Sequence, residues 1–371
     1  MMGSQTERHR PDGLRSDMST AQKLREIARR GVPLLILVAI VVAIILVATT
    51  TGIVLQRRVI FGLVNLVAVV GLYIFMGNSG ILNFGSVGFM AIGAYTSALL
   101  TMMPAMKHTF LPDLPAWLAV TQLPPLAGAF AAGGVAATVG LVVGWPIMRL
   151  SGIGAAIATM SLLIICYIVL GNWNAVTGGQ QSLMGLPSYV GLWTAGLWAI
   201  AAIVLAFVYQ ETRWAIALRA SREDEVAATA SGVHVVRQRL IAFVLSCFVS
   251  GIAGALFAHF LGTLRVESFY LDPTFLLISM LVVGGMRSLT GALAGTVCIS
   301  VLTEALRQLE VGIRVPGMDV TLATAPGLGD VVLAALMLLI ILFRPQGITG
   351  GREISLPFND RPGRRPEHNK D

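Results

Sequence analysis

The sequence is dominated by long runs of apolar residues that recur along the chain and are separated by short polar segments. A helix needs about 20 apolar residues to cross the roughly 30 Å hydrocarbon core of a bilayer. By this measure we predict ten membrane spans, at about 33–54, 59–76, 84–103, 126–148, 152–170, 195–209, 239–261, 274–286, 291–309 and 328–343. The sixth and eighth of these are short for a full crossing, so we expect them to be tilted, broken or partly re-entrant.

The composition excludes the main classes of water-soluble protein. Of the 371 residues, 12% are charged and 56% hydrophobic, and the mean hydropathy is +0.79, whereas a soluble domain has about 25% charged residues. An ordinary cytoplasmic enzyme, a nucleic-acid-binding protein and a disulfide-rich secreted domain are therefore excluded. The net charge of +7 does not indicate nucleic acid, because the basic residues lie in tails and short loops. The predicted fold class is all-α: a polytopic integral membrane bundle of about ten helices, surrounded by membrane lipid.

The positions of the basic residues predict the orientation of the bundle. With the N-terminus inside and an even number of spans, 20 of the 26 Lys and Arg residues fall on the cytoplasmic side, as the positive-inside rule requires. The pair Arg57-Arg58 is the clear exception. We expect a basic cytoplasmic tail at 1–32, a transmembrane domain at 33–344 and a polar cytoplasmic tail at 345–371.

The segment 77–88 (GNSGILNFGSVG) interrupts an apolar stretch with four glycines and four small polar side chains. Such a sequence is a poor continuous helix. Irregular backbone at membrane depth occurs only where it is buried in protein or lines a wet cavity. The segment is either a break that lines a translocation pathway or a plain cytoplasmic turn. The hypothesised pathway-lining residues are Asn78, Ser79, Gly80, Asn83 and Ser86.

Residues 171–187 (GNWNAVTGGQQSLMGLP) form an uncharged, glycine-rich polar segment. By the predicted orientation this loop faces outward. Its amides and backbone donors suit docking of a partner or closing of a gate, although an ordinary connector is the alternative. The candidate residues for that role are Asn172, Trp173, Thr177, Gly178 and Gly179.

The largest internal cytoplasmic segment, 210–239, contains a predicted short helix over 222–231. Ser221 with an acid three residues later is a capping-box pattern, and Gly232 provides a stop. Three consecutive acids, 223–225, lie where the helix dipole favours negative charge. Val226, Ala227 and Ala230 form a small apolar patch that would fit a groove on a partner. The alternative is a helix that only covers the surface of the bundle.

Several chemical signatures are missing from the sequence. There is no phosphate-binding loop, and the only lysines are Lys23, Lys107 and Lys370. No nucleophile constellation or metal site emerges, so we expect no enzyme. Acids deep in the spans are nearly absent, which counts against an ion-coupled secondary transporter or a channel acting alone. Glu304 is expected to pair with Arg307 across one helical turn, and His259 to be a packed or interfacial side chain.

Several blocks of sequence, in order, resemble the membrane permease subunits of branched-chain amino acid ABC importers, the larger of the two paired subunits in particular. The resemblance covers about residues 60–347. The blocks are 88–95 (GFMAIGAY), 149–153 (RLSGI), 155–159 (AAIAT), Asn172-Trp173, 177–187 (TGGQQSLMGLP), 217–228 (ALRASREDEVAA), 251–259 (GIAGALFAH), 283–291 (VGGMRSLTG) and 343–347 (FRPQG).

This resemblance implies the fold of an ABC importer transmembrane domain and identifies 210–239 as the coupling loop that docks on the ATPase. It implies that ATP is bound by separate ATP-binding cassette subunits, so that this chain carries no cofactor. It also implies a paralogous permease subunit and a periplasmic substrate-binding protein as partners, in a bacterial inner membrane. The residues expected to contact the ATPase are Arg219, Arg222, Glu223, Asp224, Glu225, Ala227, Ala228 and Gly232.

The expected function is therefore that of a permease subunit for branched-chain or other hydrophobic amino acids. Two stretches depart from the pattern of the family. Family members often carry Gln, Ser and His within 77–89, and Gly-Gly-Pro-Asn-Gly where this chain has Gly-Gly-Gln-Gln-Ser at 178–182. Urea, short amides and aromatic acids, which permeases of the same fold carry, therefore remain as alternative cargoes.

Overall fold

The computed structural model describes residues 20–311, 313–314, 321–322, 327–344, 346–351 and 353. Within these residues the chain is almost entirely helical, with two small two-stranded sheets that pair β1 with β2 and β3 with β4. The elements are α1 (Thr20–Thr49), α2 (Ile53–Ser79), α3 (Ser86–Thr101), α4 (Pro104–Phe110), α5 (Ala116–Val120), α6 (Pro125–Ile147), α7 (Gly152–Asn172), α8 (Asn174–Thr177), β1 (Leu183–Met184), α9 (Leu192–Gln210), α10 (Arg213–Glu223), α11 (Glu225–Ala230), α12 (Val235–Leu261), β2 (Thr263–Leu264), the 3-10 helix η1 (Val266–Phe269), α13 (Leu271–Gly284), α14 (Leu289–Val311), β3 (Ile313–Arg314), β4 (Thr321–Leu322) and α15 (Leu328–Phe343).

A helix occupies each of the ten predicted spans, which confirms the predicted all-α membrane bundle. Eight apolar helical segments among the described residues are long enough to cross a membrane, and α3 and α15 have 16 residues each. The sixth span is longer than predicted, because α9 starts at Leu192 and has 19 residues. The eighth is short as a single helix, as expected, because α13 has 14 residues. Together with η1 it forms the 19-residue apolar stretch Val266–Gly284, which is one of the eight.

The first helix begins well before the predicted start of the first span. The basic residues up to position 32 were assigned to a tail, but α1 is helical from Thr20. Lys, Arg, Glu and Ala are good helix formers, so a polar segment can extend an apolar helix beyond the bilayer. The rest of the predicted N-terminal tail, and most of the predicted C-terminal tail, lie outside the described residues.

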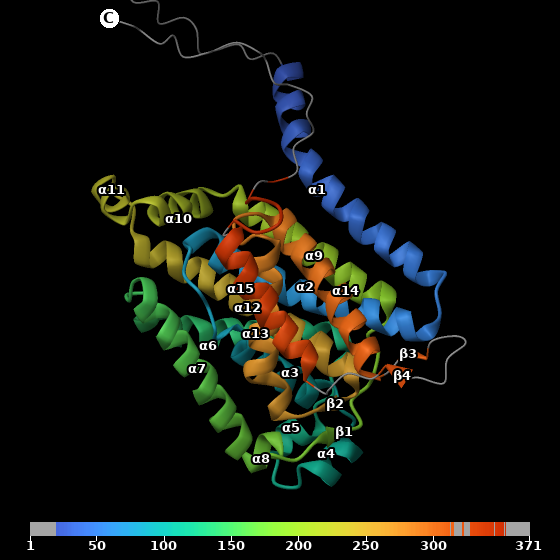
Figure 1. Ribbon diagram of the computed structural model, residues 1–371. Helices are drawn as coiled ribbons and strands as arrows, with labels where there is room; N and C mark the ends of the chain where they lie inside the picture. Colours follow the sequence, from blue (N-terminus) through green and yellow to red (C-terminus); the bar gives the residue numbers. More distant parts are fainter. Residues whose placement is uncertain are drawn as a thin grey trace, which may run out of the picture.

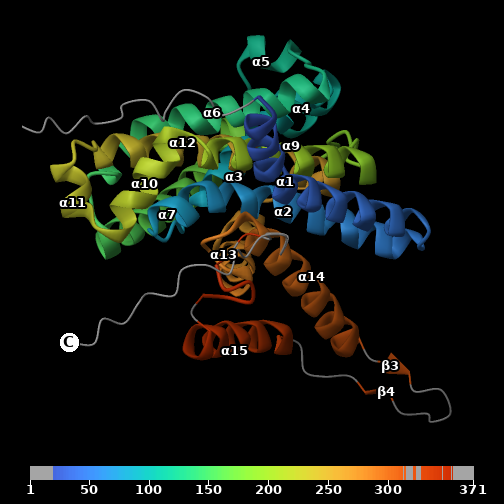
Figure 2. The ribbon, with the colours of Figure 1, turned by 90° about the horizontal axis from the view of Figure 1, so that it is seen from above.

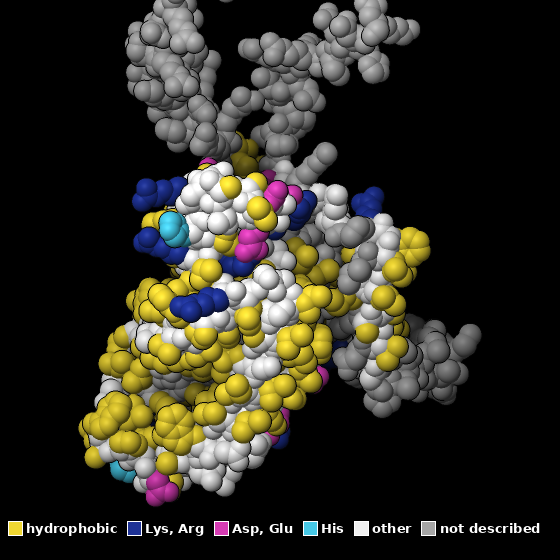
Figure 3. Space-filling model, turned by 90° about the vertical axis from the view of Figure 1, so that its left-hand side faces the viewer, with side chains coloured by type: hydrophobic (Ala, Val, Ile, Leu, Met, Phe, Trp, Pro, Cys, Tyr) yellow, Lys and Arg dark blue, Asp and Glu magenta, His cyan; other side chains and the backbone are white. Residues whose placement is uncertain are grey.

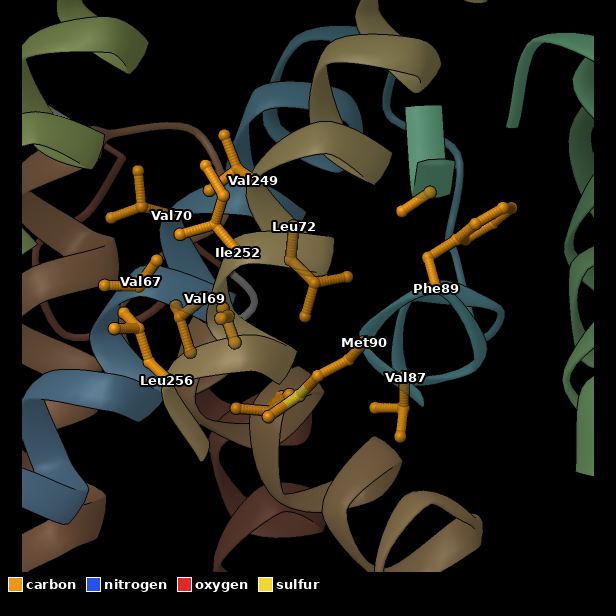
Figure 4. Packing of buried hydrophobic residues seen from close by; sticks show 14 of the residues in the cluster. Val67, Val69, Val70, Leu72, Val87, Phe89, Met90, Val249, Ile252 and Leu256 are labelled. Carbon is orange, nitrogen blue, oxygen red and sulfur yellow. The ribbon is translucent and has the colours of Figure 1, made fainter. Parts of the chain in front are cut away.

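Helices α2, α3 and α12 form the centre of the fold, and α6 packs on α3 and α12 from one side (Figures 1 and 2). Every residue of α2 from 63 to 79 is buried, which explains why this helix is apolar on all sides. Figure 4 shows Val67 and Leu72 of α2 among Ile252 and Leu256 of α12 and Met90 of α3. Helices α13 and α14 pack on α2 from the other side and carry α15 at their outer surface.

Glycines let the central helices approach to backbone contact. A Cβ added at Gly254 of α12 would lie 1.8 Å from the carbonyl oxygen of Met90 in α3. The sequence motifs Gly140-Leu-Val-Val-Gly144 and Gly291-Ala-Leu-Ala-Gly295 each put two glycines on one helix face and so predict close helix packing. The pair 140/144 of α6 lies against α12, where a Cβ at Gly140 would be 2.7 Å from the sulfur of Cys247. In the pair 291/295 of α14, a Cβ added at Gly295 would lie 1.8 Å from the carbonyl oxygen of Met280 in α13, and one added at Gly291 would lie 2.3 Å from that of Gly285 in the turn after α13. These contacts confirm the predicted packing role of both pairs.

The two ends of the bundle are distinct. One end, here called the α10–α11 end, carries α10, α11 and the turn between α13 and α14; the opposite α4–α5 end carries α4, α5, α8 and β1 (Figure 1). In Figure 3 charged side chains gather at the α10–α11 end, and hydrophobic side chains cover much of the surface below it. This distribution is that of a protein whose middle is in contact with lipid.

The exceptional arginine pair at 57–58 is partly neutralised. Arg58 Nη1 lies 2.8 Å from Glu304 Oε2 and so joins α2 to α14. Glu304 also approaches Arg307 Nε at 3.8 Å, which confirms the predicted contact across one turn.

Candidate coupling segment and the helices it contacts

The segment between α9 and α12 folds into two short helices rather than one. The predicted helix start at Ser221 is wrong, because this residue lies inside α10 and its hydroxyl donates to the carbonyl oxygen of Leu218 at 2.8 Å. The good helix formers at 215–220 carry α10 past Ser221. The actual cap is Asp224, whose carboxylate accepts from the backbone N–H groups of Val226 and Ala227, each at 2.9 Å.

The predicted stop at Gly232 is confirmed. Helix α11 ends at Ala230, and Gly232 adopts a left-handed φ of 85°. The N–H of Val233 then bonds to the carbonyl oxygen of Ala228 at 3.1 Å, which satisfies a free carbonyl group at the helix end.

The residues expected to contact an ATPase divide into an exposed group and a group directed into the bundle. The side chain of Val226, at the start of α11, is 80% exposed. Ala228 is buried, and Arg219 and Arg222 are partly buried. The tip of the segment is thus free to meet a partner, while its arginines hold it to the transmembrane helices. The exposed members are Glu223, Asp224, Glu225, Ala227 and Gly232.

Arg222 connects α10 to the end of α2. Its Nη1 donates to the carbonyl oxygen of Gly77 at 2.6 Å, where the helix dipole of α2 favours a cation. The aliphatic part of Arg222 packs over Gly80, where an added Cβ would lie 2.7 Å from Arg222 Cγ. The structure therefore brings a predicted coupling residue against the predicted break between two spans.

Glu223 extends this contact to a third element. Its Oε1 accepts from Arg222 Nη2 at 3.0 Å and from Arg287 Nη2, in the turn between α13 and α14, at 2.9 Å. The hydrogen bond from Arg222 and the charge of Arg287 hold the pKa of Glu223 below its ordinary value. The carboxylate is therefore ionised near neutral pH and bridges the two arginines.

A further connection between the segment 210–239 and the bundle was not predicted from the sequence. Arg219 Nη2 donates to the carbonyl oxygen of Gln210 at 2.7 Å, and the Gln210 side chain bonds to Tyr73 of α2 and to Glu353. Glu353 accepts from the backbone N–H of Leu289 at 2.8 Å and so caps the start of α14. Glu353 belongs to the predicted polar tail. The only feature of the sequence that could have indicated its role is its position shortly after the Arg-Pro-Gln-Gly block at 344–347.

The beginning of that predicted tail packs against the turn between α13 and α14. The N–H of Ile348 bonds to the carbonyl oxygen of Val283 at 2.9 Å, and the Thr349 hydroxyl bonds to that of Gly284 at 2.8 Å. Gly347 lies directly on Gly285, where no side chain would fit. Residues 347–349 thus bind the same turn that Arg287 joins to the segment 210–239.

The predicted break at 77–88 is present, as six residues between α2 and α3. Gly80 caps α2 in a left-handed conformation with φ of 73° and is exposed. Several backbone N–H groups of the break find partners: Gly85 N–H donates to Asn83 Oδ1 at 3.0 Å, Phe84 N–H to Thr159 Oγ1 of α7 at 3.3 Å and Ile81 N–H to Ser79 Oγ at 3.2 Å. The other four candidates for the pathway are buried: Asn78, Ser79, Asn83 and Ser86.

Three of these buried side chains keep atoms without a hydrogen-bond partner among the described residues. They are Asn78 Oδ1, Asn83 Nδ2 and Ser86 Oγ. An unpaired buried polar atom costs about 1–3 kcal/mol, so such atoms are uncommon where only packing is required. Their role in lining a pathway stays a prediction.

The glycine-rich loop at 171–187 lies at the α4–α5 end, opposite the coupling segment (Figure 1). Asn172 and Trp173 are exposed at the end of α7, whereas the Thr177 hydroxyl is buried and bonds to the carbonyl oxygen of Leu170. Gly178 and Gly179 both adopt left-handed φ values, 71° and 62°. The loop is thereby folded back on α7 and presents an amide and an indole to its surroundings.

His259 joins this loop to the core. Its Nδ1 lies 2.9 Å from the carbonyl oxygen of Pro187, and its Nε2 lies 2.9 Å from Ser97 Oγ of α3. The N–H at Nδ1 must then donate to the carbonyl, which leaves Nε2 to accept from the hydroxyl. Complete burial of the ring confirms the expectation of a packed histidine. Among the described residues there is no cluster of three His, Cys, Asp or Glu that could hold a metal.

Comparison with known proteins gives one consistent result. Residues 54–341 match the family model described as branched-chain amino acid transport system / permease component. Over 312 residues the chain is 30% identical to the high-affinity branched-chain amino acid transport system permease protein LivM of Salmonella typhimurium and 28% identical to LivM of Escherichia coli; each match covers 75% of this chain and 66% of the relative.

More distant relatives carry other names. The chain is 25% identical to LivH of Escherichia coli over 77% of its length and 91% of the relative. It is 24% identical to the nucleoside ABC transporter permease protein NupC of Lactococcus lactis, over 71% of its length and 86% of the relative. No solved structure matches. The chain belongs to the family of branched-chain amino acid transport system permease components, which are membrane subunits and not themselves enzymes.

Proposed function

We propose that this chain is the permease subunit of an ATP-binding cassette importer, and that the segment 210–239 transmits motion of the ATPase to the helices. The observation that carries this proposal is the contact of Arg222 with Gly77, together with the contact of Glu223 with Arg287. These two contacts join an exposed segment to the end of α2 and to the turn between α13 and α14. Displacement of α10 would act directly on the end of α2 and, through Arg287, on the turn before α14.

In this proposal the exposed tip of α11 enters a groove on the ATPase, and ATP is hydrolysed by that separate subunit. Closure of two ATPase subunits would push the coupling segments together and switch the bundle between two packing states. The distribution of basic residues supports a cytoplasmic position for the α10–α11 end and for both termini, in a bacterial inner membrane. A periplasmic binding protein would then dock on the loop 171–187, at the opposite end.

The proposed cargo is a branched-chain or other hydrophobic amino acid, brought through a pathway formed with a paralogous permease subunit. The names of the LivM and LivH relatives support this cargo and a system with two permeases. The break between α2 and α3, with its buried unpaired polar atoms, is the proposed pathway element, so alanine replacement of Asn78 or Asn83 should lower transport. The nucleoside relative makes a nucleoside a second candidate, beside urea, short amides and aromatic acids.

The test is uptake into vesicles that contain the assembled complex, with ATP trapped at the ATPase side. Labelled leucine, uridine, urea and an aromatic acid are offered in turn. Val226→Asp places a charge on the exposed patch of α11, and Thr109→Asp places the same charge on an exposed site of α4 at the opposite end. We expect ATP-dependent uptake of leucine, lost in Val226→Asp and kept in Thr109→Asp. Preference for another solute would replace the cargo, and uptake without ATP would refute the importer.

A further inference from the structure

We propose that the α10–α11 end carries a binding site for an anionic phospholipid. The site is the groove between α6, α12 and the loop after α11, with a volume of about 1290 Å³ and walls that include Leu141, Leu240, Val244 and Phe248. A second hollow of about 430 Å³ adjoins it. A pocket for a drug-sized ligand has about 300–1,000 Å³, so the groove is large enough for an extended acyl chain and a head group. This inference does not depend on the proposed transport.

The length of the groove matches one leaflet of a bilayer. Along α6 its walls extend from Trp145 back to Ala137, and along α12 from Arg237 to Phe248. At 1.5 Å per residue these stretches are about 12 Å and 16 Å long, close to half of the roughly 30 Å hydrocarbon core. An acyl chain that enters from the head-group region would therefore find apolar walls over its whole depth in the leaflet.

The mouth of the groove has the composition of a membrane interface. The indoles of Trp145 and Trp214 are 58% and 42% exposed. The guanidinium of Arg149 lies 5.6 Å from the ring centroid of Trp145, and that of Arg213 lies 5.7 Å from the ring centroid of Trp214. Tryptophan is enriched at the level of the head groups, so the mouth lies where the phosphate of a phospholipid would be.

The charge at this mouth selects an anion. Arg149 follows the end of α6, Arg213 begins α10 and Arg237 lies in α12. None of the three forms an ion pair with a carboxylate among the described residues. The one acid that lines the groove, Glu225, is neutralised by Arg239 at 2.7 Å. Guanidinium groups bind phosphate oxygens through paired hydrogen bonds, and basic pockets between membrane helices bind anionic head groups. A zwitterionic lipid would leave the positive charge unbalanced.

The experiment measures lipid binding to the purified complex by native mass spectrometry in detergent, with phosphatidylglycerol or phosphatidylcholine added. The double variant Arg149→Gln/Arg237→Gln removes two charges from the mouth, and Arg149→Lys/Arg237→Lys keeps them. The control, Arg57→Gln, removes an exposed arginine near the start of α2, at the end of this helix that lies away from Gly77 and α10. All three arginines are exposed, so these variants leave the packing of the core unchanged. Phosphatidylglycerol brominated on its acyl chain then locates the lipid by quenching of Trp145, with Trp145→Phe as the reference.

We expect the complex to retain phosphatidylglycerol in preference to phosphatidylcholine. Each Arg→Gln change should weaken binding about fivefold, which corresponds to about 1 kcal/mol per basic residue at a membrane surface. The Lys variant should keep most of the affinity, Arg57→Gln all of it, and Trp145→Phe should lose part of the quenching. Equal retention of the two lipids, or equal behaviour of the double variant and Arg57→Gln, overturns the proposal. Displacement by inorganic phosphate, or no quenching because a subunit covers the groove, also overturns it.

Discussion

Replacement of Arg222 tests the mechanical link between the coupling segment and the bundle. Arg222→Met keeps most of the aliphatic stem over Gly80 but removes the guanidinium. The hydrogen bond to the carbonyl oxygen of Gly77 has a charged donor and is partly buried, so its loss costs about 1.5–3 kcal/mol. The contact with Glu223 adds little, because that carboxylate is 63% exposed and its charge is screened by solvent. We expect a total loss of about 1.5–3 kcal/mol.

The consequence should be uncoupling rather than loss of the complex. The lost free energy corresponds to a factor of roughly 10–150 in the equilibrium between linked and unlinked α10, since about 1.4 kcal/mol is tenfold. ATP hydrolysis should continue in Arg222→Met while solute uptake per ATP hydrolysed falls by at least tenfold. Glu223→Gln, which removes the exposed ion pairs but keeps Arg222 on Gly77, should change this ratio less than threefold.

The assay measures phosphate release and labelled uptake in the same proteoliposomes. An unchanged ratio of uptake to hydrolysis in Arg222→Met would refute the assignment of Arg222 as a link. Equal effects of Arg222→Met and Glu223→Gln would show that the surface ion pairs, and not the contact with Gly77, carry the motion.

Three further outcomes follow from contacts elsewhere. Glu353→Ala leaves the N-terminal N–H groups of α14 without their cap and should destabilise the protein by about 1–3 kcal/mol, seen as a lower melting temperature in detergent; an unchanged value would contradict the tie. Gly254→Ala should abolish stable folding because its methyl group meets backbone at 1.8 Å, whereas Gly134→Ala, with no atom within 4 Å, should express and melt as the wild type. Because the pKa of Glu223 is lowered in the folded protein, its ion pairs add stability at a pH above the unfolded-state pKa near 4.5, and this stability is lost as the pH falls through the folded-state pKa. The rate of hydrogen exchange in α10, corrected for the intrinsic rate, should therefore be constant from neutral pH to about 5 and should rise only in stronger acid.

Much of the fold was predictable because a bilayer imposes the length and polarity of its helices. Each of the ten runs became a helix, and the glycine pairs 140/144 and 291/295 became contacts, since both features are local in the sequence. Local signals also have limits. Ser221 has the pattern of a helix cap, yet the residues before it continue the helix and Asp224 takes that role.

The connections of the coupling segment were not predictable from local sequence. Arg222 and Gly77 are 145 residues apart, and Gln210 and Glu353 are 143 apart. Each such contact depends on how α2, α10 and α14 pack against one another, and the periodicity of hydrophobic residues in the sequence does not predict this packing. The resemblance to a family indicated that the segment docks on a partner, but the side chains that tie it to the bundle became visible only in the folded chain.

We propose above all that the tip of α11 contacts an ATP-binding subunit. The most direct measurement places a photo-crosslinking amino acid at position 226 in the assembled complex and identifies the crosslinked species by mass spectrometry, with the same label at position 109 as reference. We expect crosslinks from position 226 to the ATP-binding subunit and none from position 109. Crosslinks from position 226 to this chain or to lipid alone, in a complex that retains the ATPase, would contradict it.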